Sequence, residues 1–272
     1  FMLPFVERLG NKIPPFDFRV PGVTSITADV HKYGYAAKGA SVILYRNMEY
    51  LKHQFFVYTE WCGGIFISPA LLGTRSGGPI AAAWAAMQAL GMNGYMERAR
   101  IVMEATTKLT EGIAAIPGLK ILGKPPMSVF AYASDEPALS IYAVGDLLEK
   151  KGWHVDRLQK PEALHAMVTP GHLAVADSFL SDLREAVEEA RDHAELADKG
   201  NAAMYGIMAN LPLRGMVKKN VLKVMEQMYG PDGAMPDLDT AALDTDGGEA
   251  GQDMTVKIAT WLVKLKRRFG KK

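Results

Sequence analysis

The sequence predicts an α/β protein made of two structural units and a helical tail. Two short β-branched segments near the start are followed by a long helical pattern, as in a domain that combines a sheet with helices. A Pro-Gly pair at residues 117–118 then precedes a second series of short strands and helices. We expect a large unit over residues 1–116, a small α+β unit over 117–212 and a tail over 213–272.

The composition is that of an ordinary globular protein. The chain has 272 residues, of which 49% are hydrophobic and 22% charged, and a formal net charge of +1. So small a charge argues against attraction of nucleic acid to the whole surface. Cys62 is the only cysteine, which excludes an intrachain disulfide and a thiolate metal site. We therefore expect a cytoplasmic protein with neither a metal ion nor a nucleic-acid partner.

The large unit begins with segments that are typical of buried strands. Residues 23–27 are short and β-branched, and residues 40–45 form a second such run after a glycine-containing turn. The aromatic and glycine-rich stretch 58–78 is expected to be a loop. Residues 79–116 predict a long buried helix that breaks near Gly91. The chain contains no run of 18 apolar residues, so we expect no transmembrane segment in it.

The small unit has the order strand, strand, helix, strand, helix. Strands are expected over residues 119–122, 129–132 and 165–168. Helices are expected over residues 139–151 and 178–197, because apolar residues recur there at helical spacing.

The tail differs in composition from the rest. Residues 213–229 predict a helix, and residues 231–251 predict a mobile acidic linker with few large apolar side chains. Residues 254–269 predict an amphipathic helix with a basic polar face. Such a helix can lie on an anionic membrane surface, although packing against its own protein is the commoner role of this pattern.

Lys32 is the candidate for a covalent cofactor site. It follows the first predicted strand, and ligands of open α/β sheets gather at the carboxyl ends of strands. A lysine on such a rigid mount can form a Schiff base with an aldehyde when a partly desolvated pocket eases its deprotonation. His31 precedes Lys32, and Asp29 is expected to anchor the turn by accepting backbone hydrogen bonds. By position alone, a lysine after a strand is more often a solvated loop residue.

A longer string around Lys32 resembles a known family. Residues 25–34 and 36–46, followed by residues 61–66 and 73–78, are similar to the cofactor-lysine region of the sphingosine-1-phosphate lyases. These enzymes belong to the group II decarboxylase branch of the enzymes that use pyridoxal 5′-phosphate (PLP). The resemblance covers most of residues 1–212, which would correspond to the C-terminal half of a lyase.

The resemblance also implies a fold. Residues 1–116 would be the C-terminal part of an aspartate-aminotransferase-like (fold type I) large domain that binds PLP. Residues 117–212 would be the small α+β domain that follows it.

Four residues receive roles from the resemblance. Lys32 would carry PLP through a Schiff base, and His31 would contact the cofactor phosphate. Lys38 stands in the dipeptide Lys38-Gly39, which points to the lyases rather than to amino-acid decarboxylases, and it would bind the phosphate of the substrate. Thr74 would reach the cofactor phosphate of a partner subunit, with help from backbone N–H groups of its glycine-rich loop. A homodimer with shared active sites is thereby implied.

The implied reaction is the retro-aldol cleavage of sphingosine 1-phosphate, or a related phosphorylated sphingoid base, to a long-chain aldehyde and phosphoethanolamine. PLP would act as the electron sink. In this family the acidic partner of the pyridine nitrogen, the ring-stacking aromatic group and the main phosphate loop lie upstream of the segment that matches Phe1. We therefore expect the N-terminal half of the enzyme as a partner, and activity only in its presence.

Two other functions stay open. An amino-acid decarboxylase of the same branch would share Lys32 and His31 but would need a carboxylate-binding arginine instead of Lys38. A non-catalytic subunit that keeps the fold would bind no cofactor.

Overall fold

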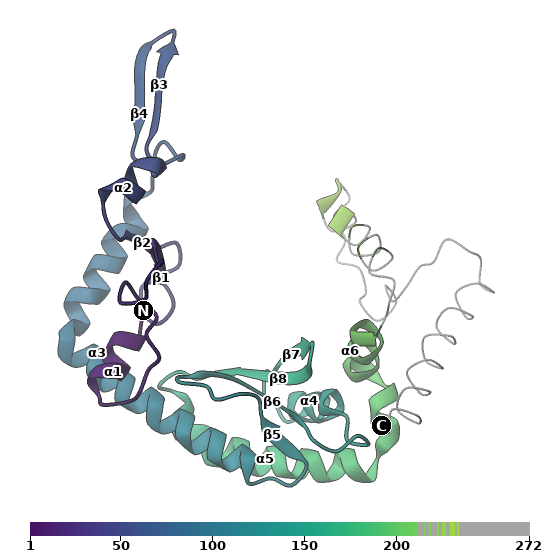
Figure 1. The fold of residues 1–272 in the computed structure, drawn as a ribbon. Helices are drawn as coiled ribbons and strands as arrows, with labels where there is room; N and C mark the ends of the chain where they lie inside the picture. The colour runs from purple at the N-terminus through teal and green to yellow at the C-terminus, as the bar shows by residue number, and fades with distance from the viewer. Residues whose placement is uncertain are drawn as a thin grey trace. The chain divides into compact units, whose positions relative to one another are not determined.

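The computed structural model describes residues 1–210 and, beyond them, residues 215, 218, 222, 225, 226, 229–231 and 233. The described residues form two compact units, which divide between residues 104 and 105 (Figure 1). Apart from residues 231 and 233, the predicted acidic linker lies outside the described residues, and so does the whole helix predicted over 254–269. Among the described residues, no helix is long and apolar enough to span a membrane.

The first strand pair of the first unit lies close to where the sequence predicts it. β1 (Ser25–Asp29) begins two residues later than expected and pairs antiparallel with β2 (Ser41–Tyr45). The middle of β2 carries three exposed hydrophobic residues in a row, Val42, Ile43 and Leu44. Since successive residues of a strand point to opposite faces, both faces of β2 are apolar, as in a sheet that is covered on both sides.

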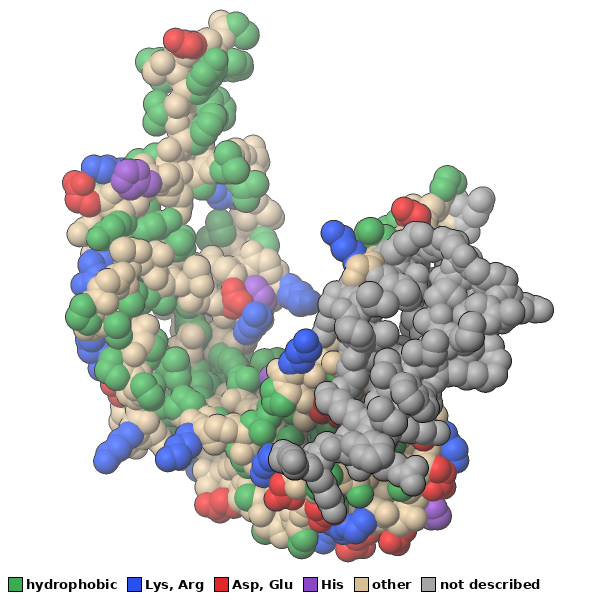
Figure 2. All heavy atoms as spheres, turned by 45° about the vertical axis from the view of Figure 1, so that its right-hand side comes forward, with side chains coloured by type: hydrophobic (Ala, Val, Ile, Leu, Met, Phe, Trp, Pro, Cys, Tyr) green, Lys and Arg blue, Asp and Glu red, His purple; other side chains and the backbone are tan. Residues whose placement is uncertain are grey.

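A β-hairpin occupies the first part of the stretch 58–78, where the predicted loop is wrong. β3 (Phe56–Trp61) and β4 (Gly64–Ser68) pair antiparallel, and the chain reverses at the turn residues Cys62 and Gly63. Gly64, the first residue of β4, has a φ of 106°. The aromatic and β-branched residues that suggested an irregular loop are those that strands favour. All of β3 is exposed, and hydrophobic side chains gather along the hairpin (Figure 2).

Helices complete the first unit. α1 (Leu3–Arg8) opens the chain, and α2 (Met48–Leu51) with the short helix η1 (Lys52–Gln54) joins β2 to the hairpin. α3 (Gly77–Ala114) follows the hairpin and is kinked at Gly91, whose φ of 54° and ψ of −171° are not helical. The predicted break near Gly91 is therefore confirmed, and glycine adopts this left-handed φ without a steric penalty.

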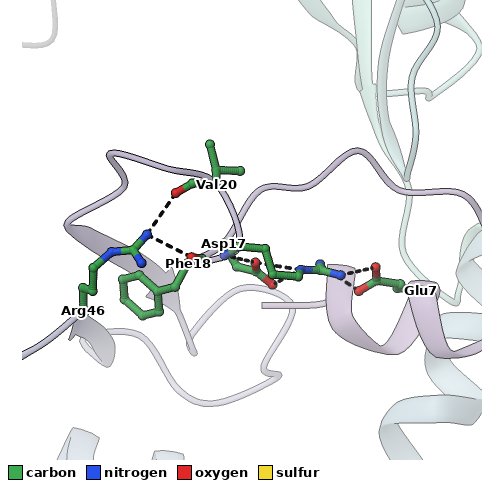
Figure 3. A network of polar contacts seen from close by, with 6 residues as sticks. Glu7, Asp17, Phe18, Val20 and Arg46 are labelled. Carbon is green, nitrogen blue, oxygen red and sulfur yellow. Dashed lines mark hydrogen bonds and ion pairs between the residues drawn. The ribbon is translucent and has the colours of Figure 1, made fainter.

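Two arginines fix the loop that leads into β1 (Figure 3). Arg19 donates to Glu7 Oε1 over 2.7 Å and to Asp17 Oδ1 over 2.8 Å, which ties the loop to α1. Arg46 follows β2 and donates to the backbone carbonyls of Val23, Phe18 and Val20 over 2.7, 2.9 and 2.9 Å. The start of β1 is thus fixed from both sides.

The second unit contains a four-stranded antiparallel sheet in the order β5-β6-β8-β7. Its strands are β5 (Leu119–Ile121), β6 (Val129–Ser134), β7 (Asp156–Gln159) and β8 (Glu162–Met167). β5, β6 and β8 overlap the three predicted strands. β7 is an additional one, because its mixed sequence Asp-Arg-Leu-Gln carries no strand signal and its pairing with β8 decides its structure.

Helices pack on this sheet. They are α4 (Ile141–Lys150), α5 (His172–Asp192), the short η2 (Ala194–Asp198) and α6 (Gly200–Asn210). α5 begins six residues before its predicted start, because Leu173 and Ala176 extend its apolar face into the core. The last residues of α3 join the same core through Ala105, Leu109 and Ile113.

Candidate active site

Lys32 lies in a short turn that follows β1 and is closed by backbone hydrogen bonds. The amide of Tyr35 donates to Lys32 O over 3.0 Å, and the amide of Ala36 donates to Val30 O over 3.2 Å. Val30 is buried in a small cluster with Ala40 and with Ala83 of α3. The turn is therefore fixed by packing beneath it as well as by its own hydrogen bonds.

The Lys32 side chain itself is 59% exposed. The described residues thus provide the rigid mount that the sequence predicts but not the desolvated pocket. Among the described residues β1 pairs only with β2, so its other edge has no strand beside it there.

Asp29 binds the Lys32 side chain. Its Oδ2 lies 2.6 Å from Lys32 Nζ, and its Oδ1 accepts a 2.5 Å hydrogen bond from the Ser41 hydroxyl. The hydrogen bond from Lys32, followed by that from Ser41, lowers the pKa of Asp29 to about 2. We expected backbone amides as the partners of this carboxylate, and the structure instead shows two side-chain donors.

His31 is oriented by one backbone carbonyl. Its Nδ1 lies 2.7 Å from Ala40 O, which also accepts from the His31 amide over 3.0 Å. Because a carbonyl oxygen can only accept, Nδ1 must carry a hydrogen. Nε2 is then the ring atom left for a ligand, and it donates a hydrogen bond to a phosphate only when the ring is doubly protonated.

Lys38 stands on the same connection as Lys32 and is exposed. It makes no hydrogen bond or ion pair with another residue in the described part of the chain. Next to it, Gly39 has a φ of 102°, and a Cβ at this position would lie 3.2 Å from Cγ of Pro79. The Lys38 turn therefore lies against the first turn of α3, and glycine permits this close approach.

Thr74 is exposed in the loop between β4 and α3. This loop is held by Ser68 Oγ, which donates to Leu72 O over 3.0 Å, and by Arg75, which donates to the same oxygen over 3.0 Å. Arg75 thus folds back onto its own loop. The amino end of α3 begins three residues after Thr74 and has no acidic residue in its first turn, an arrangement that favours an anion.

The chain places three of the four predicted residues on one segment, and the start of α3 packs against that segment. His31, Lys32 and Lys38 share the connection between β1 and β2. The contact of Gly39 with Pro79 and the burial of Ala83 bring the start of α3 to that connection. The chemistry of these groups fits PLP, which carries an aldehyde and a phosphate. The groups are the Lys32 amine, the His31 imidazole, the Lys38 ammonium and the backbone N–H groups at the amino end of α3.

Comparison with known proteins shows which enzymes the chain is similar to. No protein-family profile matches the chain. A sphingosine-1-phosphate lyase of Oryza sativa subsp. japonica is 48% identical over 226 residues, which are 83% of this chain and 42% of the relative. A sphingosine-1-phosphate lyase of Arabidopsis thaliana is 47% identical over 229 residues, 84% of this chain and 42% of the relative. The chain is a relative of the sphingosine-1-phosphate lyases.

Solved structures agree with this relationship. The structure of a sphingosine-1-phosphate lyase from Burkholderia pseudomallei superposes with a TM-score of 0.71 and 42% identity, covering 84% of this chain and 47% of that one. A glutamate decarboxylase from Lactobacillus brevis shares the fold with a TM-score of 0.56 at 23% identity, covering 70% of this chain and 45% of the decarboxylase. The predicted resemblance and the predicted fold class, part of a fold type I enzyme of the α/β class, are both confirmed. The chain spans about 42% of the length of the first plant relatives.

Proposed function

We propose that this chain is part of a PLP-dependent lyase that cleaves phosphorylated long-chain sphingoid bases to a long-chain aldehyde and phosphoethanolamine. One observation carries the proposal: Lys32 and Lys38 stand exposed on a single connection between β1 and β2. The similarity to lyases at 48% and 47% identity supports it.

Lys32 is the proposed attachment point of the cofactor. Lys32 lies in a hydrogen-bonded turn, and its amine is accessible to solvent. An aldehyde can therefore approach the amine to form a Schiff base. When bound, PLP supplies an electron sink for breaking a carbon–carbon bond. When it does not hold the cofactor, the Lys32 amine would be able to transfer a proton.

Two further residues are proposed to hold the cofactor phosphate. His31 would donate from Nε2, since Nδ1 is bound to Ala40 O. Thr74 would act together with the amino end of α3 and would serve the active site of a second subunit, which makes the functional unit a homodimer. An anion at that helix end gains from the helix dipole.

Lys38 is proposed to select the substrate. A compact ammonium without a competing partner suits a phosphate dianion. An amino-acid decarboxylase would instead need an arginine that grips the substrate carboxylate in two places. The phosphorylated amino alcohol is therefore the proposed substrate class.

The rest of the enzyme is proposed to come from additional polypeptide. The chain spans 42% of the length of its plant relatives, and β1 leaves one edge without a strand among the described residues. A carboxylate in the additional part would keep the pyridine nitrogen of PLP protonated. Activity then requires both parts.

Borohydride trapping tests the proposal. The protein that carries this chain, incubated with PLP and reduced with borohydride, should gain the cofactor mass on Lys32 alone. Lys52 is the matched control, because it too pairs with a carboxylate three residues away, Glu49, over 2.7 Å. Lys32→Ala should abolish the label, whereas Lys52→Ala should keep it.

Substrate assays separate the competing functions. The labelled protein should release long-chain aldehyde from a phosphorylated sphingoid base and should not act on glutamate or on aromatic amino acids. Release of carbon dioxide from an amino acid would support the decarboxylase instead. Absence of any label in the complete protein would favour a non-catalytic subunit.

A further inference from the structure

The Lys32 side chain is 59% exposed, and its ammonium pairs with Asp29 of the same segment, so its position depends on the backbone of that segment. The Lys32 carbonyl accepts from the Tyr35 amide over 3.0 Å, so the peptide that follows Lys32 is oriented by Tyr35. Tyr35 has a φ of 58°, a left-handed conformation that large residues adopt only when their surroundings impose it. Something outside the turn must therefore impose it.

Tyr95 of α3 supplies one such contact. Its hydroxyl donates to Gly34 O over 2.8 Å, across 61 positions of sequence. Tyr95 is only 4% exposed, and its ring packs against Phe1 and Phe5 with centroids 5.2 and 5.1 Å apart. A hydroxyl on so well packed a ring is a fixed donor.

Arg98 supplies a second contact, one helical turn further along α3. Its guanidinium carbon lies 5.1 Å from the centroid of the Tyr35 ring. Residues three positions apart share one face of a helix, so Tyr95 and Arg98 contact two successive residues, Gly34 and Tyr35, from the same side.

Glycine at position 34 makes this contact possible. A Cβ at this position would overlap the carbonyl oxygen of Val30, and it would lie 2.8 Å from Val30 Cα. The turn therefore leaves no room for a side chain at position 34, and the Gly34 carbonyl lies within hydrogen-bonding distance of Tyr95 on α3.

We infer that Tyr95 is a positioning residue for Lys32: its hydroxyl, assisted by the Arg98 guanidinium stacked on Tyr35, fixes the turn that aims the Lys32 amine. The part of this inference that concerns PLP rests on the proposed function. The part that concerns the turn does not.

Hydrogen exchange tests the turn directly. In the protein that carries this chain, Tyr95→Phe removes the hydroxyl and keeps the ring that packs on Phe1 and Phe5. The amides of Tyr35 and Ala36 should then exchange about three- to tenfold faster, as the loss of one buried hydrogen bond predicts. Tyr45→Phe is the matched control, because it removes a hydroxyl that donates to Gln54 Oε1 over 2.7 Å elsewhere in the same unit. It should leave these amides unchanged.

A spectroscopic readout connects the turn to Lys32. Visible absorbance should develop about three- to tenfold more slowly when PLP is added to Tyr95→Phe than to the wild type or to Tyr45→Phe, because the loosened turn aims the amine less well. Arg98→Ala should change the absorbance in the same direction.

The outcomes separate the two proposals. The inference is wrong if Tyr95→Phe leaves hydrogen exchange in residues 29–36 unchanged, or if it speeds exchange throughout residues 1–104. It is also wrong if the turn exchanges faster but the absorbance develops at the wild-type rate. If the wild type develops no absorbance while Tyr95→Phe loosens the turn alone, the proposed cofactor is wrong and the role of Tyr95 in fixing the turn stands.

Discussion

The Lys32 ammonium lies 2.6 Å from the Asp29 carboxylate, three residues before it in the chain. An ammonium has no lone pair with which to attack an aldehyde, and the Asp29 carboxylate occupies the side of the amine that it contacts. Asp29 therefore competes with the cofactor for Lys32, and the consequences of this competition can be measured.

Asp29→Asn should speed the attachment of PLP to Lys32. Because a solvent-exposed ion pair contributes little, we expect a rate about two- to fivefold higher at neutral pH. Borohydride trapping at timed intervals measures the rate. Asp17→Asn is the control, since Asp17 pairs with Arg19 over 2.8 Å and should leave the rate unchanged. Slower trapping in Asp29→Asn would mean that the carboxylate assists the reaction.

Acid should weaken the Lys32 turn over a defined range of pH. Hydrogen bonds from Lys32 and then Ser41 lower the pKa of Asp29 from its ordinary 3.8 to about 2. Since the folded pKa lies below the unfolded one, the stabilising contribution of Asp29 is complete above about pH 4 and is lost as the pH falls toward 2. The carboxyl carbon signal of Asp29 in an NMR titration should have its midpoint near 2, and Ser41→Ala should raise that midpoint. An unperturbed midpoint would contradict the ion pair.

Lys38→Ala should impair the use of a phosphorylated substrate far more than the binding of PLP. The loss of a charge-assisted contact predicts a KM about ten- to hundredfold higher, with PLP affinity changed by less than about twofold because Lys38 does not hold the cofactor in this proposal. Steady-state kinetics and a PLP titration measure the two effects. Lys124→Ala removes another exposed lysine and should change neither. Equal losses in both measurements would argue against a phosphate-binding role.

Arg157→Met should destabilise the second unit strongly. The Arg157 side chain is only 5% exposed and lies 2.6 Å from Asp146 and 2.7 Å from Glu149. Its removal leaves two partly exposed carboxylates without this partner, and we expect a loss of about 2–4 kcal/mol in the free energy of unfolding.

Arg100→Met is the surface control for this loss. Arg100 makes two ion pairs of similar length, 2.8 and 2.9 Å, but its side chain is 53% exposed. Because solvent screens exposed ion pairs, its loss should lower the free energy of unfolding much less than the loss of Arg157. Denaturant unfolding, followed by circular dichroism, measures the free energy of unfolding of both variants. Equal losses would mean that the burial of Arg157 does not make its ion pairs more stabilising than those of Arg100.

The local pattern of residues predicts part of the fold correctly. Both strands that flank Lys32 and the break of α3 at Gly91 follow from β-branched runs and from a glycine. The hairpin of β3 and β4 does not, because its strands stabilise each other by pairing and a linear pattern does not show which segments pair. The same holds for β7, which is a strand only because β8 lies beside it.

The chemical groups of the candidate site and the relationship to the lyases can be predicted from the residues alone, because His31, Lys32 and Lys38 stand within one short segment. How that segment is held depends on contacts made in the folded chain. Tyr95 donates a hydrogen bond to Gly34 across 61 positions of sequence, and Gly39 lies against Pro79 of α3. Contacts of this kind depend on how segments far apart in the sequence pack together, so the spacing of residues along the chain does not predict them.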